Sequence, residues 1–88
     1  MTSRLALALY PSSSAIRADY AVALLNLARY HEAIAMTTKA LALHPTHIEA
    51  YNNYGVALYK LERYKEATVR YRTGIALRHV HRDMFPVS

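Results

Sequence analysis

This chain repeats itself with a period of 34 residues. The segment from Leu27 to Ala33 returns, with most residues unchanged, between Leu61 and Ala67, and the same offset carries Tyr20 onto Tyr54. A fixed period of this size is typical of chains built from stacked copies of one supersecondary unit. Each copy buries its apolar face against the next copy. We therefore expect an array of repeats.

The same offset applies toward the N-terminus. It carries Pro45 onto Pro11, and the apolar run 40–43 onto the run 6–9. The N-terminal apolar stretch is therefore in register with the repeats, and we interpret it as the last helical turns of an earlier, incomplete repeat instead of a secretory signal. The resulting division of the single domain 1–88 is an incomplete repeat over 1–13, full repeats over 14–47 and 48–81, and a tail over 82–88.

Each full repeat divides into two helices by its apolar spacing and its punctuation. Hydrophobic residues make up 53% of the chain, with only two glycines and three prolines, a composition that favours helix throughout. The spacing predicts helices over about 15–27, 31–43, 47–60 and 65–78. Caps come from the serines at 12–14 and from a Thr46-to-Glu49 capping box, and Pro45 separates the pairs. Short connections make neighbouring helices antiparallel, so the fold class is all-α.

Small and large residues alternate along these helices in a way that suits close packing. We expect the helices to approach one another at small residues, namely Ala21, Ala33, Gly55 and Ala67. The space between them is expected to be filled by large residues, namely Tyr30, Leu58 and Tyr64, and the tyrosines Tyr54 and Tyr71 are also expected in the core.

With these residues the chain resembles the tetratricopeptide repeat family, whose 34-residue unit follows a W-x2-L-G-x2-Y…A-x3-F…P pattern. The second unit reads Tyr51-x2-Tyr54-Gly55-x2-Leu58 and then Ala67-x3-Tyr71, with His79 at the usual proline position. The first unit reads Arg17-x2-Tyr20-Ala21-x2-Leu24, then Ala33-x3-Thr37 and Pro45. The resemblance implies a right-handed α-solenoid in which the first helix of each pair lines a concave, peptide-binding groove.

Charge and composition limit the classes of partner. The formal charge is +5, but the basic residues are scattered and form no continuous run, which weighs against a nucleic-acid partner. No apolar run approaches the roughly 20 residues of a membrane-spanning helix. The absence of cysteine excludes a disulfide framework and a thiolate metal site. It leaves the compartment open, with a slight preference for the cytoplasm.

We find no arrangement of residues that predicts catalysis, a cofactor or a metal site. Histidine pairs stand at His44 and His47 and at His79 and His81, but the sequence places no carboxylate ligand beside them. The serines at 12–14 lack an associated base or a glycine elbow, and we interpret them as helix caps. The chain is therefore not expected to be an enzyme.

The candidate groove residues follow from helical spacing and from the use that the family makes of its first helices. They are Asp19, Val22 and Asn26 in the first unit and Glu49, Asn52, Asn53, Val56, Tyr59 and Lys60 in the second. Many peptide-binding members of the family carry an asparagine at the position of Asn53, where its amide can both donate to and accept from an extended peptide backbone. The equivalent residue of the first unit is Asp19, so no asparagine ladder is formed.

The function that we predict is a non-catalytic scaffold that binds a protein or an extended peptide in the groove. Two alternatives from other classes stay open. In the first alternative, the chain is a substrate-presenting repeat segment of a larger enzyme, such as a glycosyltransferase. In the second, it is a self-assembly module. The latter follows because a short array has open ends, and each end leaves apolar surface for a further copy.

Overall fold

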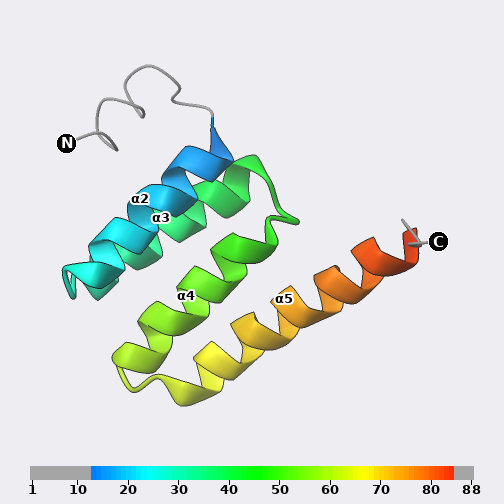
Figure 1. The fold of residues 1–88 in the computed structure, drawn as a ribbon. Coiled ribbons are helices and arrows are strands. Elements are labelled where there is room, and N and C mark those ends of the chain that lie inside the picture. Colours follow the sequence, from blue (N-terminus) through cyan, green and yellow to red (C-terminus); the bar gives the residue numbers. More distant parts are fainter. Residues whose placement is uncertain (1–12, 85–88) are drawn as a thin grey trace.

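The structure, a computed structural model, describes the backbone of residues 13–84 and the side chains of residues 13–80. Within this range the chain forms the α-helices α2 (Ser14–Asn26), α3 (Tyr30–Leu43), α4 (Ile48–Lys60) and α5 (Tyr64–Met84), and no strand. Consecutive helices run antiparallel (Figure 1). The prediction of an all-α fold of helix-turn-helix repeats is confirmed, while the incomplete repeat expected before Ser13 lies outside the described residues.

The helices stack in chain order. The helices α2 and α3 form one antiparallel pair, α4 and α5 form the next, and α4 packs against α3 at the junction between the two pairs. The first helices of the two pairs, α2 and α4, also touch. Each unit therefore meets its neighbour through α4, which contacts both helices of the first unit.

The turns inside the two units have the same backbone geometry. Each first helix ends in a turn with one residue at positive φ, Ala28 at 58° and Glu62 at 63°. In each turn the next N–H bonds back to a carbonyl of the helix, from Arg29 N to Leu24 O and from Arg63 N to Leu58 O, both at 2.9 Å. This is the Schellman arrangement, which satisfies the last carbonyls of a helix. The sequence repeat is therefore also a repeat in local structure.

An ion pair follows each of these turns at the same relative position. Arg29 pairs with Glu32 and Arg63 pairs with Glu66, in both cases three residues further along the chain. These side chains are about half exposed, so each pair contributes little to stability. The two ion pairs repeat with the 34-residue period, and they neutralise two of the basic residues of the chain.

The helix starts agree with the sequence only in part. Ser13 is the N-cap of α2, and its Oγ accepts a hydrogen bond from Ile16 N at 3.2 Å, as expected for the serine cluster. The capping box between Thr46 and Glu49 was a wrong prediction, because α4 begins at Ile48 and its N-cap is His47. His47 stands 34 residues after Ser13, so the repeat period itself indicates the correct cap position.

The predicted small residues do lie where the helices approach. Ala21, Ala33 and Ala67 are buried, and Leu58 fills the space between helices as expected. Gly55 allows the closest approach, because a Cβ built there would lie 2.7 Å from Cε1 of Tyr71, well inside van der Waals contact. The ring of Tyr71 on α5 thus packs directly on the backbone of α4.

Two large residues behave differently although they are equivalent in the repeat. Tyr30 is half-buried and packs against the cluster of Leu24, Ala33 and Ala57. Tyr64 is 53% exposed, so its prediction as a core residue was wrong. The physical reason is that α4 covers Tyr30, whereas no further helix covers Tyr64 within the described residues.

Polar groups are accommodated at two further core positions. Thr37 is fully buried, and its hydroxyl donates to the carbonyl of Ile34 at 2.9 Å, which satisfies a group that would otherwise be costly to bury. Tyr54 is half-buried, and the guanidinium carbon of Arg70 lies 4.6 Å from the centre of its ring. This cation–π contact links α4 to α5.

The helix α5 is longer than expected. The sequence predicted an end near Arg78, but the helix continues to Met84 and so takes in the first residues assigned to the tail. The helix α3 ends at Leu43, just before Pro45. The equivalent of Pro45 is His79, which has a backbone N–H and a free φ, so the helix passes through it. The end of α5 consequently projects from the stack (Figure 1).

Candidate protein-binding groove

The candidate residues of the first unit share one face of α2. Asp19, Val22 and Asn26 are spaced by three and four residues, which places them on one side of a helix, and all three are exposed. The 34-residue offset carries these positions onto Asn53, Val56 and Lys60 of α4. The two first helices therefore present the same stripe of positions, and Glu49 extends the stripe of α4 by one turn.

Asn53, in the stripe of α4, reaches across to α2. Its side chain is half-buried, and Nδ2 donates to the backbone carbonyl of Ala18 on α2 across 3.4 Å. This distance is long for an N–H···O hydrogen bond, so the contact is weak. Asn53 thus joins the first helices of the two units while its amide remains only loosely engaged.

Asn52 and Tyr59 lie on a different side of α4. A Cβ built on Gly74 of α5 would lie 3.1 Å from Oδ1 of Asn52, so this amide is packed toward α5. The ring of Tyr59 meets the ring of Tyr64 edge-on, with centroids 5.2 Å apart. The structure therefore separates these two candidates from Glu49, Asn53, Val56 and Lys60, which follow the stripe on the side of α2.

The chemistry of the stripes is mixed. Asp19 and Glu49 supply carboxylates and Lys60 supplies an ammonium group, and all three are exposed. Val22 is 41% exposed, and Val56, the equivalent residue of the second unit, is half-buried. Such a surface, with apolar centres, charged ends and an amide, suits an extended polypeptide. The backbone of such a ligand needs hydrogen-bond partners, and its successive side chains point alternately toward and away from the surface.

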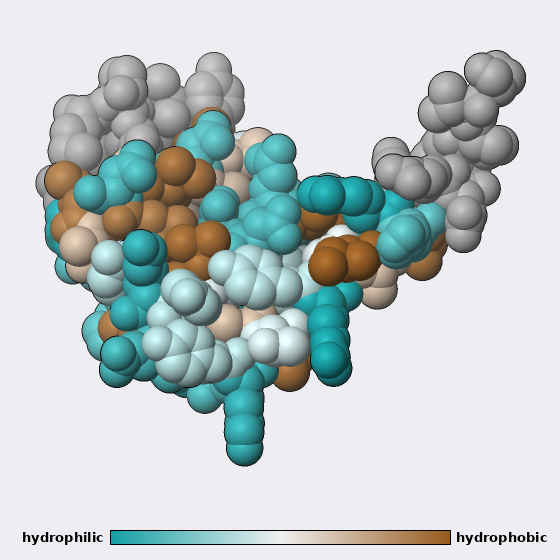
Figure 2. Space-filling model, turned by 60° about the horizontal axis from the view of Figure 1, so that its bottom comes forward, coloured by the Kyte–Doolittle hydropathy of each residue, from teal (hydrophilic) through white to brown (hydrophobic). Residues whose placement is uncertain are grey.

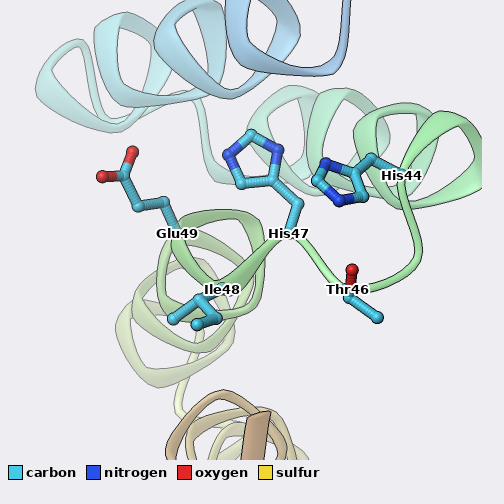
Figure 3. Close-up of a pocket in the computed structure, with 5 residues that line it drawn as sticks. All are labelled: His44, Thr46, His47, Ile48 and Glu49. Carbon is cyan, nitrogen blue, oxygen red and sulfur yellow. The ribbon is translucent and has the colours of Figure 1, made fainter. Parts of the chain in front are cut away.

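A hollow of about 430 Å³ opens where α3 passes into α4. It is lined by His44, Thr46, His47, Ile48 and Glu49. In Figure 3 the ring of His47 lies between the ring of His44 and the carboxylate of Glu49, which is directed toward α2. The hollow therefore adjoins the N-terminal end of the stripe on α4.

A hydrogen-bonded link that the sequence did not reveal lies beside this hollow. The hydroxyl of Ser14 donates to the carbonyl of Ala40 at 3.0 Å, and its Oγ is 2.6 Å from Nδ1 of His47. The structure therefore brings an imidazole to Ser14, which the sequence did not predict for these serines. A serine carries one hydroxyl proton, so a hydroxyl that donates to Ala40 accepts from His47. An imidazole that donates to the serine is not activating it as a nucleophile, and the arrangement ties α2, α3 and the start of α4 together.

No metal site is found in the part of the chain that the structure describes, where no three histidine, cysteine or carboxylate side chains gather. The rings of His44 and His47 are neighbours, with centroids 5.5 Å apart. His79 is exposed on α5, and the side chain of His81 lies outside the described residues. Between residues 14 and 84, none of the helices combines the length and the apolar character that crossing a membrane requires.

Comparison with known families agrees with this geometry. The sequence model of the tetratricopeptide repeat matches residues 36–68, which comprise the C-terminal part of α3, all of α4 and the start of α5. The chain therefore contains a tetratricopeptide repeat, and its four described helices are arranged as repeats of that kind. A comparison with curated proteins returns no match. Tetratricopeptide repeats are generally non-catalytic and typically bind proteins or peptides.

Proposed function

We propose that this chain is a non-catalytic scaffold that binds an extended peptide segment of a partner protein along the stripes of α2 and α4. The observation that carries the proposal is the recurrence of one stripe of positions on both first helices, exposed on α2 and partly exposed on α4. A ligand that crosses both helices meets Asp19, Val22 and Asn26 first and then Asn53, Val56 and Lys60. We also propose that the two repeats that form this binding surface extend over residues 14–47 and 48–81.

Asn53 is the residue that we expect to contact the ligand backbone. Its hydrogen bond to Ala18 is long, so an incoming peptide carbonyl can take over the amide N–H at little cost. The amide oxygen can accept a peptide N–H at the same time. Such a contact does not depend on the ligand's side chains, whereas the exposed Val22 and the charged ends of the stripes supply selectivity.

The test uses a peptide selected from a displayed random library on the purified chain. The variant Asn53→Ala removes the bridging amide and is expected to weaken that peptide's affinity by up to roughly tenfold, the effect of one net hydrogen bond. Asn52→Ala is the matched control, because it removes the neighbouring amide that packs toward α5. Equal effects of the two substitutions, or a selected peptide that still binds Asn53→Ala at full affinity, would contradict the proposal.

A second function, self-assembly, is favoured by a specific observation at the α5 side of the stack. Tyr59, Tyr64 and Ile75 are each more than half exposed there. Exposed apolar side chains that cluster on one face are typical of a contact surface. Sedimentation of the chain over a wide concentration range tests this proposal, and a mass that stays monomeric throughout would contradict it.

A further inference from the structure

We infer that copies of this chain associate head to tail, with α5 of one copy packing against α2 of the next as α3 packs against α4 within the chain. This inference rests on the proposed self-assembly and specifies the two surfaces that take part. It is argued from the repeat itself, since the junction that it requires already exists once inside the molecule.

The internal junction between α3 and α4 serves as the template. On α3 the side that meets α4 carries Tyr30, Ile34, Thr37 and Leu41, spaced by four and three residues. Tyr30 and Ile34 pack against the cluster that contains Ala57 of α4, and Thr37 is fully buried. Tyr30 and Ile34 are thus covered by the helix that follows them.

The equivalent side of α5 is uncovered. The 34-residue offset gives Tyr64, Thr68, Tyr71 and Ile75, and each is more exposed than its counterpart on α3. Tyr71 packs against Gly55 of α4, so the uncovered positions are Tyr64, Thr68 and Ile75. Ile75 is 54% exposed, whereas Leu41 is half-buried. Figure 2 brings forward the lower side of Figure 1, where α5 lies, and shows brown and pale side chains at the surface among the teal ones. Within the residues that the structure describes, no helix covers this side of α5.

The complementary surface is present on α2. The side of α4 toward α3 carries Ala50 and Ala57, which are both fully buried, and Leu61 follows at the end of the helix. Leu61 also lines a small hollow together with Tyr30, which places it against α3. The offset converts this set into Ile16 and Ala23 on α2 and Leu27 directly after it. None of these three is buried, and Leu27 is 55% exposed.

The two uncovered surfaces therefore fit each other in the way that α3 and α4 do. In the junction between copies, Leu27 of the next copy would lie near Tyr64, as Leu61 and Tyr30 line one hollow within the chain. Because the two surfaces differ, the contact is heterologous and can continue from copy to copy. The stripes of α2 and α4 would then continue across the junction, so the assembly would extend the proposed groove.

Charge favours this arrangement over a symmetric contact between two α5 helices. The described side chains of α5 include Lys65, Arg70, Arg72 and Arg78 against one carboxylate, Glu66. Two such helices would bring like charges together, which is unfavourable. The charged residues of α2 are one arginine and one aspartate, Arg17 and Asp19, so α2 offers α5 a helix without net charge.

The experiment uses three full-length variants. Ile75→Lys places a charge on the α5 surface, and Leu27→Lys places one on the α2 surface. Val69→Lys is the matched control, because Val69 is 55% exposed on another side of α5. All three sites are exposed, and circular dichroism and thermal melting in dilute solution confirm that each variant folds. Mass is then measured by sedimentation for each variant alone and for an equimolar mixture of the first two.

We expect Ile75→Lys and Leu27→Lys each to weaken association by at least about tenfold, and Val69→Lys to associate as the unmodified chain does. The mixture should form a dimer, because Leu27→Lys retains an intact α5 and Ile75→Lys an intact α2. Dimers of Leu27→Lys alone would indicate a symmetric α5 contact and overturn the inference, as would a mixture that stays monomeric. A monomeric unmodified chain would instead overturn self-assembly itself.

Discussion

The two helical units of this chain contain nearly the same turn and nearly the same small residues, yet they differ in what covers them. In the first unit α3 is enclosed between α2 and α4, and Thr37 is fully buried. In the second unit, within the described residues, α5 has a helix on one side only, and Tyr64 and Ile75 are more than half exposed. Equivalent residues thus have different environments because of their neighbours.

The comparison shows that in this fold a residue's burial depends on the next unit as much as on its own. Stability in repeat arrays is approximately a sum of unit and junction contributions. The junction between α3 and α4 is complete here, and its counterpart on α5 is missing within the described residues. Substitutions at equivalent positions should therefore cost more in the first unit than in the second, which gives a set of paired experiments.

The largest difference is expected for enlarged alanines. Ala33 is fully buried in a cluster with residues of α2 and α4, so Ala33→Leu should destabilise the fold by about 1–3 kcal/mol. Ala67 is also buried, but within the described residues no following helix holds α5 in place, so α5 can shift and Ala67→Leu should cost less. Chemical denaturation measures both, with the exposed Ala35→Leu as a control that should change little. A larger cost at Ala67 than at Ala33 would break the comparison.

A smaller difference is expected for the paired aliphatic residues Leu41 and Ile75. Leu41 is half-buried, and Leu41→Ala should cost about 1–2 kcal/mol, less than the 2–5 kcal/mol that is typical of full burial. Ile75→Ala should stay within about 0.5 kcal/mol, as for other exposed sites. Both are measured at a concentration where the chain is monomeric. Equal destabilisation by the two substitutions would mean that Ile75 is covered.

The link at Ser14 has no counterpart in the second unit, where Ile48 stands at its position. Ser14→Ala removes the hydrogen bond to Ala40 and the contact with His47, and we expect a loss of about 1 kcal/mol in unfolding free energy. Thr38→Ala is the control, since the Thr38 hydroxyl bonds only within its own helix. If both substitutions leave stability unchanged, Ser14 does not hold the two units together.

The smallest effect concerns Tyr71, the larger counterpart of Thr37. Burial raises the pKa of its phenol above the ordinary value of 10.0, and the nearby Tyr59 raises it further. A pKa that is higher in the folded state than in the unfolded state stabilises the protein below about pH 10, and this contribution is lost as pH rises through the folded value. Tyr71→Phe should therefore reduce the alkaline loss of stability, as measured by denaturation at a series of pH values. An identical alkaline profile would contradict this expectation.

Much of the fold could be predicted because it follows from local pattern. The period of 34 residues fixed the register of Ala21, Ala33 and Ala67, and these residues are buried as expected. The error at Thr46 arose from a local motif, since a threonine followed three residues later by a glutamate fits a capping box in isolation. The error at the end of α5 arose because helix length after a missing proline has no sharp signal in the sequence.

The candidate groove was less predictable. Spacing alone placed Asp19, Val22 and Asn26 on one face of α2, where the structure has them exposed. It did not separate Asn52 from Asn53, because adjacent residues on a helix point in directions about 100° apart and either could face the ligand. Only the position of α5, which takes up Asn52 beside Gly74, distinguishes the two amides.

The sequence by itself determined the period, the helical class and the two identical turns, because these depend on residues close together in the chain. The tertiary structure decided which equivalent residues are covered, and it brought Ser14 to His47 across a separation of 33 residues. A covered position requires a neighbouring helix, and contacts between helices depend on how the units stack. Tyr30 and Tyr64 share the same local sequence, so only their surroundings could make one a core residue and leave the other exposed.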